Sequence, residues 1–150
     1  MTSYNTDFYA WTKEQAQSLK AGQWAQLDIE NLVEEIESLG RQERQQLINR
    51  LGVLLGHLLK WQYQPNYRSH SWQATIREQR RRLRRLLEAN PSLQPYLPEA
   101  LQAGYEDGVD LAIQETNLPE ETFPATCPYT LDQALDADFL PDAQEDSSPC

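Results

Sequence analysis

An apolar stripe between residues 47 and 61 constrains the fold more than any other feature of this 150-residue chain. At 100° per residue, its members fall on one arc of a helix. They are Leu47, Leu51, Leu54, Leu55, Leu58, Leu59 and Trp61. Gly52 and Gly56 flank the arc four residues apart, a spacing that lets a second helix backbone approach closely. The pattern predicts a central hydrophobic helix over about 41–63.

The remainder of the chain also has helical periodicity, and no segment shows the alternation typical of a β-strand. Gln64, Pro65 and Asn66 break the chain after the central helix. Further helices are predicted over about 5–21, 28–39, 70–89, 98–116 and 131–136. Gly104 and Gly108 weaken the 98–116 helix unless they permit close packing.

Capping residues set the expected limits of the first two helices. Thr12 and Gln15 have the spacing of a capping box, and Gly22 follows as a stop. Asp28 can cap the second helix, and Gly40 is expected to end it. The core-facing stripe predicted for this helix consists of Ile29, Leu32, Val33, Ile36 and Leu39.

The predicted fold is all-α, a single-domain bundle of about five helices around a central hydrophobic helix. The length of the chain fits one domain that buries roughly two-thirds of its unfolded surface. This domain is expected to span residues 1–140. The acidic, serine-containing residues 141–150 are expected to form a disordered tail.

Positive charge is concentrated in the middle of the sequence. Residues 41–90 hold eleven basic and three acidic residues, a net +8, whereas residues 1–40 carry −5 and residues 91–150 carry −13. Six arginines lie between Arg77 and Arg85 on one predicted helix, where like charges repel one another. Something negative should therefore lie close by. The acidic segments 28–37 and 99–115 of the same chain are the first candidates.

Two other partners remain open for this helix. Arg81, Arg84 and Arg85 are expected to point outward, where they can bind an acidic protein or a second copy of the chain. The phosphate backbone of a nucleic acid is the other candidate for the Arg77–Arg85 helix. The chain's net charge of −10 disfavours this second interpretation.

The start of the 70–89 helix is a candidate anion-binding site. Arg68, Ser69, His70 and Ser71 meet there, and the unpaired N–H groups and positive dipole end of a helix N-terminus attract anions. A phosphate or carboxylate is the expected ligand. The alternative is that a serine simply caps the helix while the neighbouring aromatic residues pack on the core.

His57, at the edge of the apolar arc, is a candidate catalytic residue together with Glu34 or Glu35. A carboxylate and an imidazole can exchange a proton or hold a metal ion. The alternative is a half-buried histidine with a structural hydrogen bond. No Glu-x-x-His sequence and no cysteine pair is present, so no metal site is predicted, and the cofactors stay unknown.

Bulk features point to a protein of the cytoplasm. The sequence has no run of about 18 apolar residues, so no membrane span is predicted. The N-terminus lacks the basic and apolar regions of a secretory signal. Cys127 and Cys150 lie far apart, which disfavours a disulfide framework.

The order of these pieces resembles a bacterial, mainly cyanobacterial, family, the domain-of-unknown-function family twenty-nine. The resemblance covers about residues 4–141. The matching segments are Asp7-Phe8-Tyr9-Ala10-Trp11, the run from Leu27 to Gly40, LLGHLLKWQYQPNYRSHSW from Leu54 to Trp72, Phe123-Pro124-Ala125-Thr126-Cys127-Pro128-Tyr129 and Asp138-Phe139-Leu140-Pro141. It implies a small all-α protein and no activity. It also implies that Glu34, Glu35, His57, Lys60, Trp61, Arg68, Ser71 and Trp72 occupy family-typical positions.

Three functions are compatible with these features. A non-catalytic helical interaction or regulatory module is favoured, a homo-oligomer or a partner of another protein, because the chain has segregated charge and no catalytic motif. The first alternative is a ligand- or metal-binding enzyme with a pocket of glutamate, histidine and Arg68 between the second, third and fourth helices. The second alternative is nucleic-acid binding through the Arg77–Arg85 helix.

Overall fold

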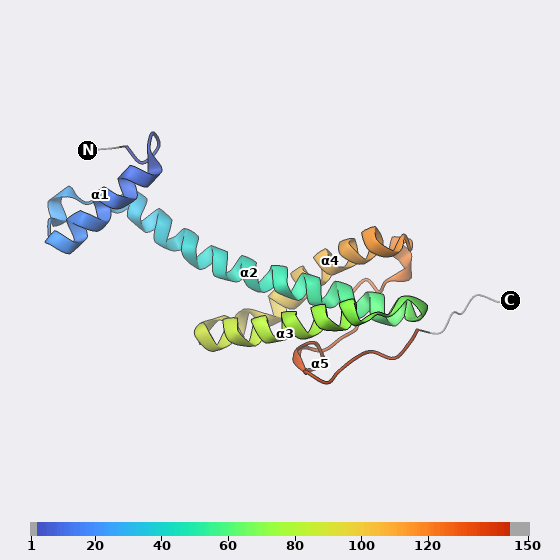
Figure 1. Cartoon of the computed structure of the whole chain (residues 1–150). Coiled ribbons are helices and arrows are strands. Elements are labelled where there is room, and N and C mark those ends of the chain that lie inside the picture. The colour runs from blue at the N-terminus through green and yellow to red at the C-terminus, as the bar shows by residue number, and fades with distance from the viewer. Residues whose placement is uncertain (1–2, 145–150) are drawn as a thin grey trace. The chain divides into compact units, whose positions relative to one another are not determined.

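The computed structural model describes residues 3–144 and confirms an all-α protein (Figure 1). No strand occurs among these residues. The helices are α1 (Phe8–Ala21), α2 (Ile29–Tyr63), α3 (His70–Ala89), α4 (Leu97–Thr116) and α5 (Leu131–Leu135). Four short 3-10 helices connect them: η1 (Trp24–Gln26), η2 (Pro65–Tyr67), η3 (Pro91–Tyr96) and η4 (Glu120–Thr122). The chain divides into two compact units, unit 1 up to Glu43 and unit 2 from Arg44 onward.

The two helices predicted over about 28–39 and 41–63 form a single helix in the structure. Helix α2 runs without interruption over 35 residues, so the prediction that Gly40 ends a helix was wrong. A glycine stops a helix when it adopts a left-handed conformation, as Gly22 does at φ 70° after α1. Gly40 does not adopt a positive φ. Its helix-weakening effect is about 1 kcal/mol, and the helix continues through it into the leucine-rich half of α2.

The caps confirm some predictions and correct one. Helix α1 begins after Asp7, whose side chain accepts a hydrogen bond from the Ala10 N–H, so the interpretation of Thr12 and Gln15 as a capping box was wrong. Thr12 lies inside the helix and donates its hydroxyl to the Tyr9 carbonyl. Asp28 precedes α2 as predicted and accepts from the Asn31 N–H at 3.5 Å.

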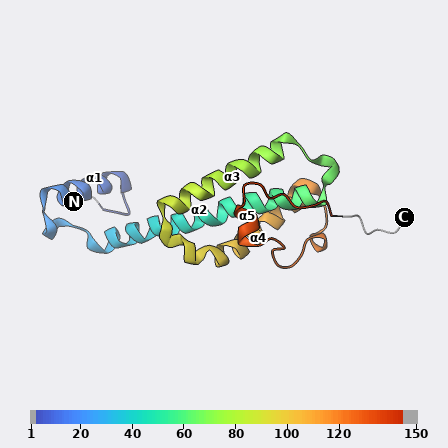
Figure 2. The ribbon, with the colours of Figure 1, turned by 90° about the horizontal axis from the view of Figure 1, so that it is seen from below.

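The core of unit 2 forms around the C-terminal half of α2 (Figure 2). Its leucine stripe packs against apolar residues of α3, α4, α5 and the segment before α5. The buried members outside α2 are Ile76, Leu83, Leu86, Leu87, Leu93, Leu97, Ala100, Tyr105, Ala112, Phe123, Tyr129 and Ala134. The central hydrophobic helix predicted from the sequence is therefore confirmed.

Helices α2 and α4 meet at four glycines, which fit the prediction of a close backbone approach. A Cβ on Gly108 would lie 2.9 Å from the Gly56 nitrogen and 3.0 Å from the Gly52 oxygen. A Cβ on Gly104 would lie 2.8 Å from that of Leu51. These positions have no room for a side chain, because the backbones themselves are in contact.

Unit 1 is built around Trp11. This side chain is buried at 2% exposure, and its indole N–H donates to Asp28 Oδ2 at 3.0 Å. Gln15, also buried, accepts the backbone N–H of Asp28 at 2.8 Å. The hydrogen bond from Asn31, followed by that from Trp11, lowers the pKa of Asp28 below its usual 3.8, against the opposing effect of burial. Asp28 thus joins α1 to the start of α2.

The C-terminal segment is held by unit 2. Pro141 is buried, and the Gln144 N–H donates to the Gln62 carbonyl at 2.7 Å. The rest of the predicted tail, residues 145–150, lies outside the described residues. Among the described helices, none is long and apolar enough to cross a membrane.

Candidate functional site

The two glutamates proposed for catalysis have partners in unit 1. Glu34 accepts a hydrogen bond from Arg41 at 2.8 Å, with both side chains more than half exposed. Glu35 accepts the hydroxyl of Tyr4. His57 is 22 residues beyond Glu35 on the same helix and belongs to unit 2. The structure therefore gives no pairing of either carboxylate with the imidazole.

His57 makes its own contacts within α2. Its Nδ1 lies 2.8 Å from the Val53 carbonyl, which fixes Nδ1 as the protonated nitrogen of the neutral ring. Burial lowers the pKa of His57, and the hydrogen bond to Val53 only partly opposes this effect. The nearby charges of Lys60 and Glu115 act in opposite directions on the same pKa. The ring is thus neutral near pH 7, with Nε2 as an acceptor.

Lys60 is a buried cation. In the sequence it was singled out only as a family-typical position. Its side chain is 5% exposed, with Nζ 3.4 Å from Glu115 Oε2 and 4.5 Å from the centre of the Trp72 ring. A carboxylate and an aromatic face both stabilise an ammonium group removed from water. The sequence signal that could have identified it is a lysine beside the leucine stripe. Lys60 joins α2 to α3 and α4.

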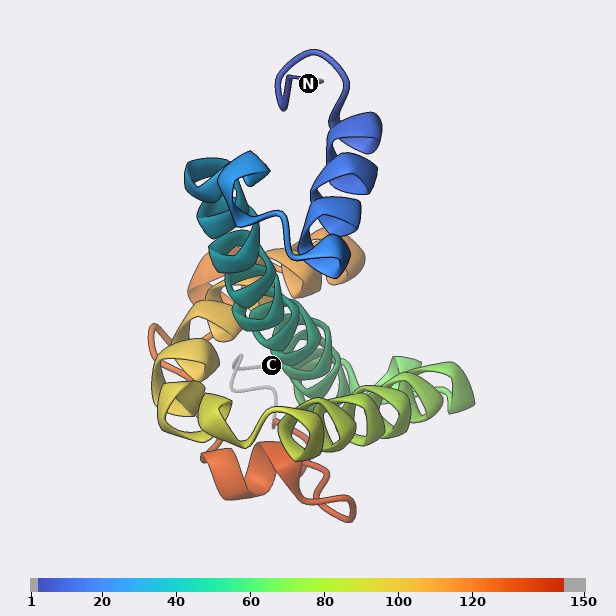
Figure 3. The same ribbon diagram turned by 90° about the vertical axis from the view of Figure 1, so that its left-hand side faces the viewer.

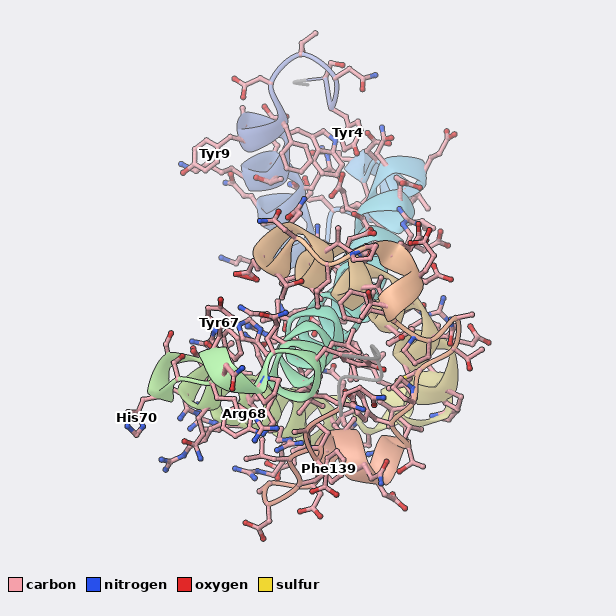
Figure 4. The ribbon with its side chains drawn as sticks, turned by 90° about the vertical axis from the view of Figure 1, so that its right-hand side faces the viewer. Tyr4, Tyr9, Tyr67, Arg68, His70 and Phe139 are labelled. Atoms are coloured by element: carbon pink, nitrogen blue, oxygen red, sulfur yellow. The ribbon has the colours of Figure 1, made fainter. Side chains whose placement is uncertain are left out.

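At the predicted anion site before α3, Arg68 and Ser69 make hydrogen bonds within the chain, whereas the buried Nη2 of Arg68 has no partner among the described residues (Figure 4). Arg68 donates through Nε to the Trp61 carbonyl at 2.9 Å and stacks on the Trp61 ring at 4.7 Å. Ser69 caps the helix by accepting from the Trp72 N–H at 3.2 Å. His70 and Ser71 are exposed. The turn joins the end of α2 to the start of α3, as the capping alternative predicts.

The six arginines of α3 have different surroundings. Arg80 is buried and donates to the carbonyls of Ala134 at 2.9 Å and Gln133 at 3.2 Å. Burial lowers its pKa, and Asp136 and Asp138 oppose that effect. Arg82 pairs with Glu78 of its own helix at 2.9 Å. Figure 3 shows α5, which Arg80 holds, beside α3.

The other four arginines have no carboxylate at ion-pair distance among residues 3–144. Arg77, Arg84 and Arg85 are exposed. Arg81 is half-buried, and its Nε has no hydrogen-bond partner among those residues. Among the described residues of unit 2, the acidic segment 99–115 makes no ion pair with these arginines, and the ion pair that α3 does make lies within the helix itself.

Two hollows flank Arg80 along α3. The first, of about 420 Å³, is lined by His70 and Arg77 together with the segment 137–140. The second, of about 300 Å³, is lined by Arg84, Glu88 and Leu135. In the part of the chain that the structure describes, no three His, Cys, Asp or Glu side chains are placed to hold a metal ion.

Unit 1 exposes the apolar stripe that was predicted to face a core. Ile29, Val33, Ile36 and Leu39 are 48% to 66% exposed. Of the nine large hydrophobic side chains exposed among the described residues, eight belong to unit 1 and only Tyr67 to unit 2. Phe8, Tyr9, Leu19 and Trp24 complete the set in unit 1. This apolar face is the largest departure from the sequence predictions.

Comparison with known proteins gives a family and no activity. No curated protein and no solved structure matches the chain. A family model described as "Domain of unknown function DUF29" matches residues 3–140, which is nearly the whole of the described chain. The chain belongs to this family, as its sequence segments indicated.

Proposed function

We propose that the protein is a non-catalytic helical interaction module that self-associates through unit 1. The observation that carries this proposal is the placement of eight of the nine exposed large hydrophobic side chains in the first 43 residues. Ile29, Val33 and Ile36 of this set share one side of α2, and exposed apolar side chains that lie together are typical of an interaction site. The catalytic alternative has less support, because Glu34 and Glu35 each have a partner other than His57.

Unit 1 buries too little to be stable as a helical hairpin. Only Trp11, Gln15 and Ser18 of α1 are buried, and no residue of α2 before Leu47 is. Folded units near or below roughly 40 residues generally need a metal, a disulfide or association with another chain. Helical hairpins meet this need by pairing into four-helix bundles.

The occupant that we propose for this face is a second copy of the same chain. On a helical wheel, Ile29, Val33 and Ile36 lie within 40° of Ile29 with no charged residue among them. Gly40 continues the stripe, and a Cβ there would meet no atom within 4 Å. Two such stripes can therefore pack closely on each other. Glu30, Glu34 and Glu37 flank the stripe on one side of α2, at about 80° to 140° from Ile29, and are exposed.

Light scattering after size-exclusion chromatography, over a dilution series, tests this proposal. The wild-type chain is expected to form a dimer that dissociates on dilution. Ile36→Glu places a charge in the stripe and is expected to give a monomer with unchanged helical circular dichroism. Tyr67→Glu is the matched control, because Tyr67 is the exposed large hydrophobic residue of unit 2. It should leave the association unchanged.

Added salt separates apolar from ionic association. Each unit 1 carries an excess of acidic residues, so two copies repel one another at low ionic strength. Association through the apolar stripe should therefore persist or strengthen as salt is added. A wild-type chain that is monomeric at every concentration, or a dimer that Ile36→Glu leaves intact, would contradict the proposal.

A further inference from the structure

We infer that the outer edge of α3 binds an acidic peptide segment of a partner protein, independently of unit 1. The site is the pair of hollows beside Arg80, which we call the α3 groove. Its cationic members are Arg77 in the first hollow and Arg84 in the second. Both are exposed and have no ion-pair partner among the described residues.

The positions of these arginines give the groove a defined spacing. Arg77 and Arg84 are seven residues apart, so they lie on one side of α3 and about 10.5 Å apart along its axis. His70 lies two turns before Arg77 on the same side and lines the same hollow. Carboxylates three residues apart in an extended peptide, or seven apart in a helix, have a similar separation.

The lining of the groove favours a peptide over a nucleic acid. Apolar side chains contribute to both hollows, with Ile76 and Leu140 in the first and Leu87 and Leu135 in the second. These side chains fit apolar residues between the carboxylates of a peptide. Asp138 and Glu88 also line the groove, so a ligand has to place its negative charges at Arg77 and Arg84 and not beside these carboxylates. Spaced carboxylates of a peptide can do this, whereas the continuous charge of a nucleic-acid backbone cannot.

Arg81 adds positive charge beside the groove. It lies between Arg77 and Arg84 on the same side of α3 but lines neither hollow. Its Nε donates to no described acceptor. Like charges along one side of a helix repel one another, and a carboxylate bound in the groove would lower that repulsion.

Fluorescence anisotropy with a labelled peptide tests this inference. The probe is a fluorescein-labelled Glu-Glu-Leu repeat peptide of about 12 residues, enough to span the two hollows. Its control is the same peptide with glutamine in place of glutamate. The full-length chain is expected to bind the acidic peptide, to ignore the control peptide, and to lose affinity as salt is added.

Single substitutions locate the binding to the groove. Arg84→Glu is expected to weaken peptide binding about tenfold. Arg85→Glu is its matched control, because Arg85 is equally exposed on the next position of α3 but lines neither hollow. It should change binding no more than about twofold. Both positions are on the surface, so circular dichroism should show that both variants fold.

Three outcomes would overturn the inference. The first is no binding of the acidic peptide at low salt. The second is an equal loss in the two variants, which would indicate diffuse charge and not a groove. The third is that a labelled DNA duplex binds at the same salt concentration while the peptide does not, which would assign α3 to nucleic acid. Since Ile36→Glu leaves the groove intact, failure of self-association does not affect this test.

Discussion

The two halves of helix α2 carry the same sequence pattern but have opposite surroundings. Leu54, in unit 2, lies on the apolar stripe and has no exposed surface. Ile36, in unit 1, lies on the corresponding side of the same helix and is 66% exposed. Periodicity thus determines that a helix has an apolar side, whereas the neighbouring elements determine whether that side is covered. Unit 2 has α3 and α4 for this role.

Truncating one apolar side chain in each half of α2 should have very different effects on stability. Leu54→Ala should reduce the free energy of unfolding by about 3 kcal/mol, because it leaves a cavity in a packed core. Ile36→Ala should change it by no more than about 0.5 kcal/mol in dilute solution, where the chain is monomeric. Urea denaturation followed by circular dichroism measures both values. Similar losses for the two variants would mean that Ile36 is covered in the monomer.

The glycines of the two halves of α2 should also differ in how they tolerate an added methyl group. Gly108→Ala should destabilise the protein by about 2 kcal/mol, because its Cβ would contact the backbone of α2 at Gly56 and Gly52. Gly40→Ala, in open space on α2, should instead stabilise it by about 0.5 to 1 kcal/mol. Both are measured by thermal and urea unfolding in the monomeric Ile36→Glu background. A stabilising Gly108→Ala would contradict the close crossing of α2 and α4.

Acid should weaken the two units in different pH ranges, which is the smallest expected effect. The pKa of His57 is lowered by burial, so its contribution to stability is full above about pH 6.5 and is lost as the pH falls from there through the folded pKa. The pKa of Asp28 is lowered by its hydrogen bonds, so its contribution is lost only below about pH 4. Urea unfolding across this pH range measures both effects. The loss of stability below about pH 6.5 should be smaller in His57→Gln, and the loss below about pH 4 should be smaller in Asp28→Asn. Identical pH profiles for the wild type and His57→Gln would mean that the imidazole titrates normally.

Local sequence signals predicted much of unit 2. The leucine stripe, the glycine pairs and the serine cap of α3 depend on residues that act through their neighbours on one helix or through one helix crossing. The error at Gly40 has a similarly local origin. A glycine can end a helix or lie within it, and the difference is its φ angle, which the sequence does not specify.

Partners distant in the sequence could not be predicted. Arg80 looked like one more surface arginine until the structure placed it against the carbonyls of α5, over fifty residues later in the chain. Lys60 likewise depends on Glu115, on another helix. The exposed stripe of unit 1 is the opposite case, since its periodicity predicts a covered side whereas Ile36 is 66% exposed among the described residues.

The two hydrogen bonds from Arg80 to α5 determine how easily the C-terminal region opens. A helix of five residues cannot persist alone, because it contains too few hydrogen bonds to offset the conformational entropy lost on nucleation. Its last carbonyls are satisfied by a guanidinium that belongs to α3. Residues 131–135 should therefore exchange their amide hydrogens, and become accessible to proteases, whenever this one side chain detaches, well before the helices of the core unfold.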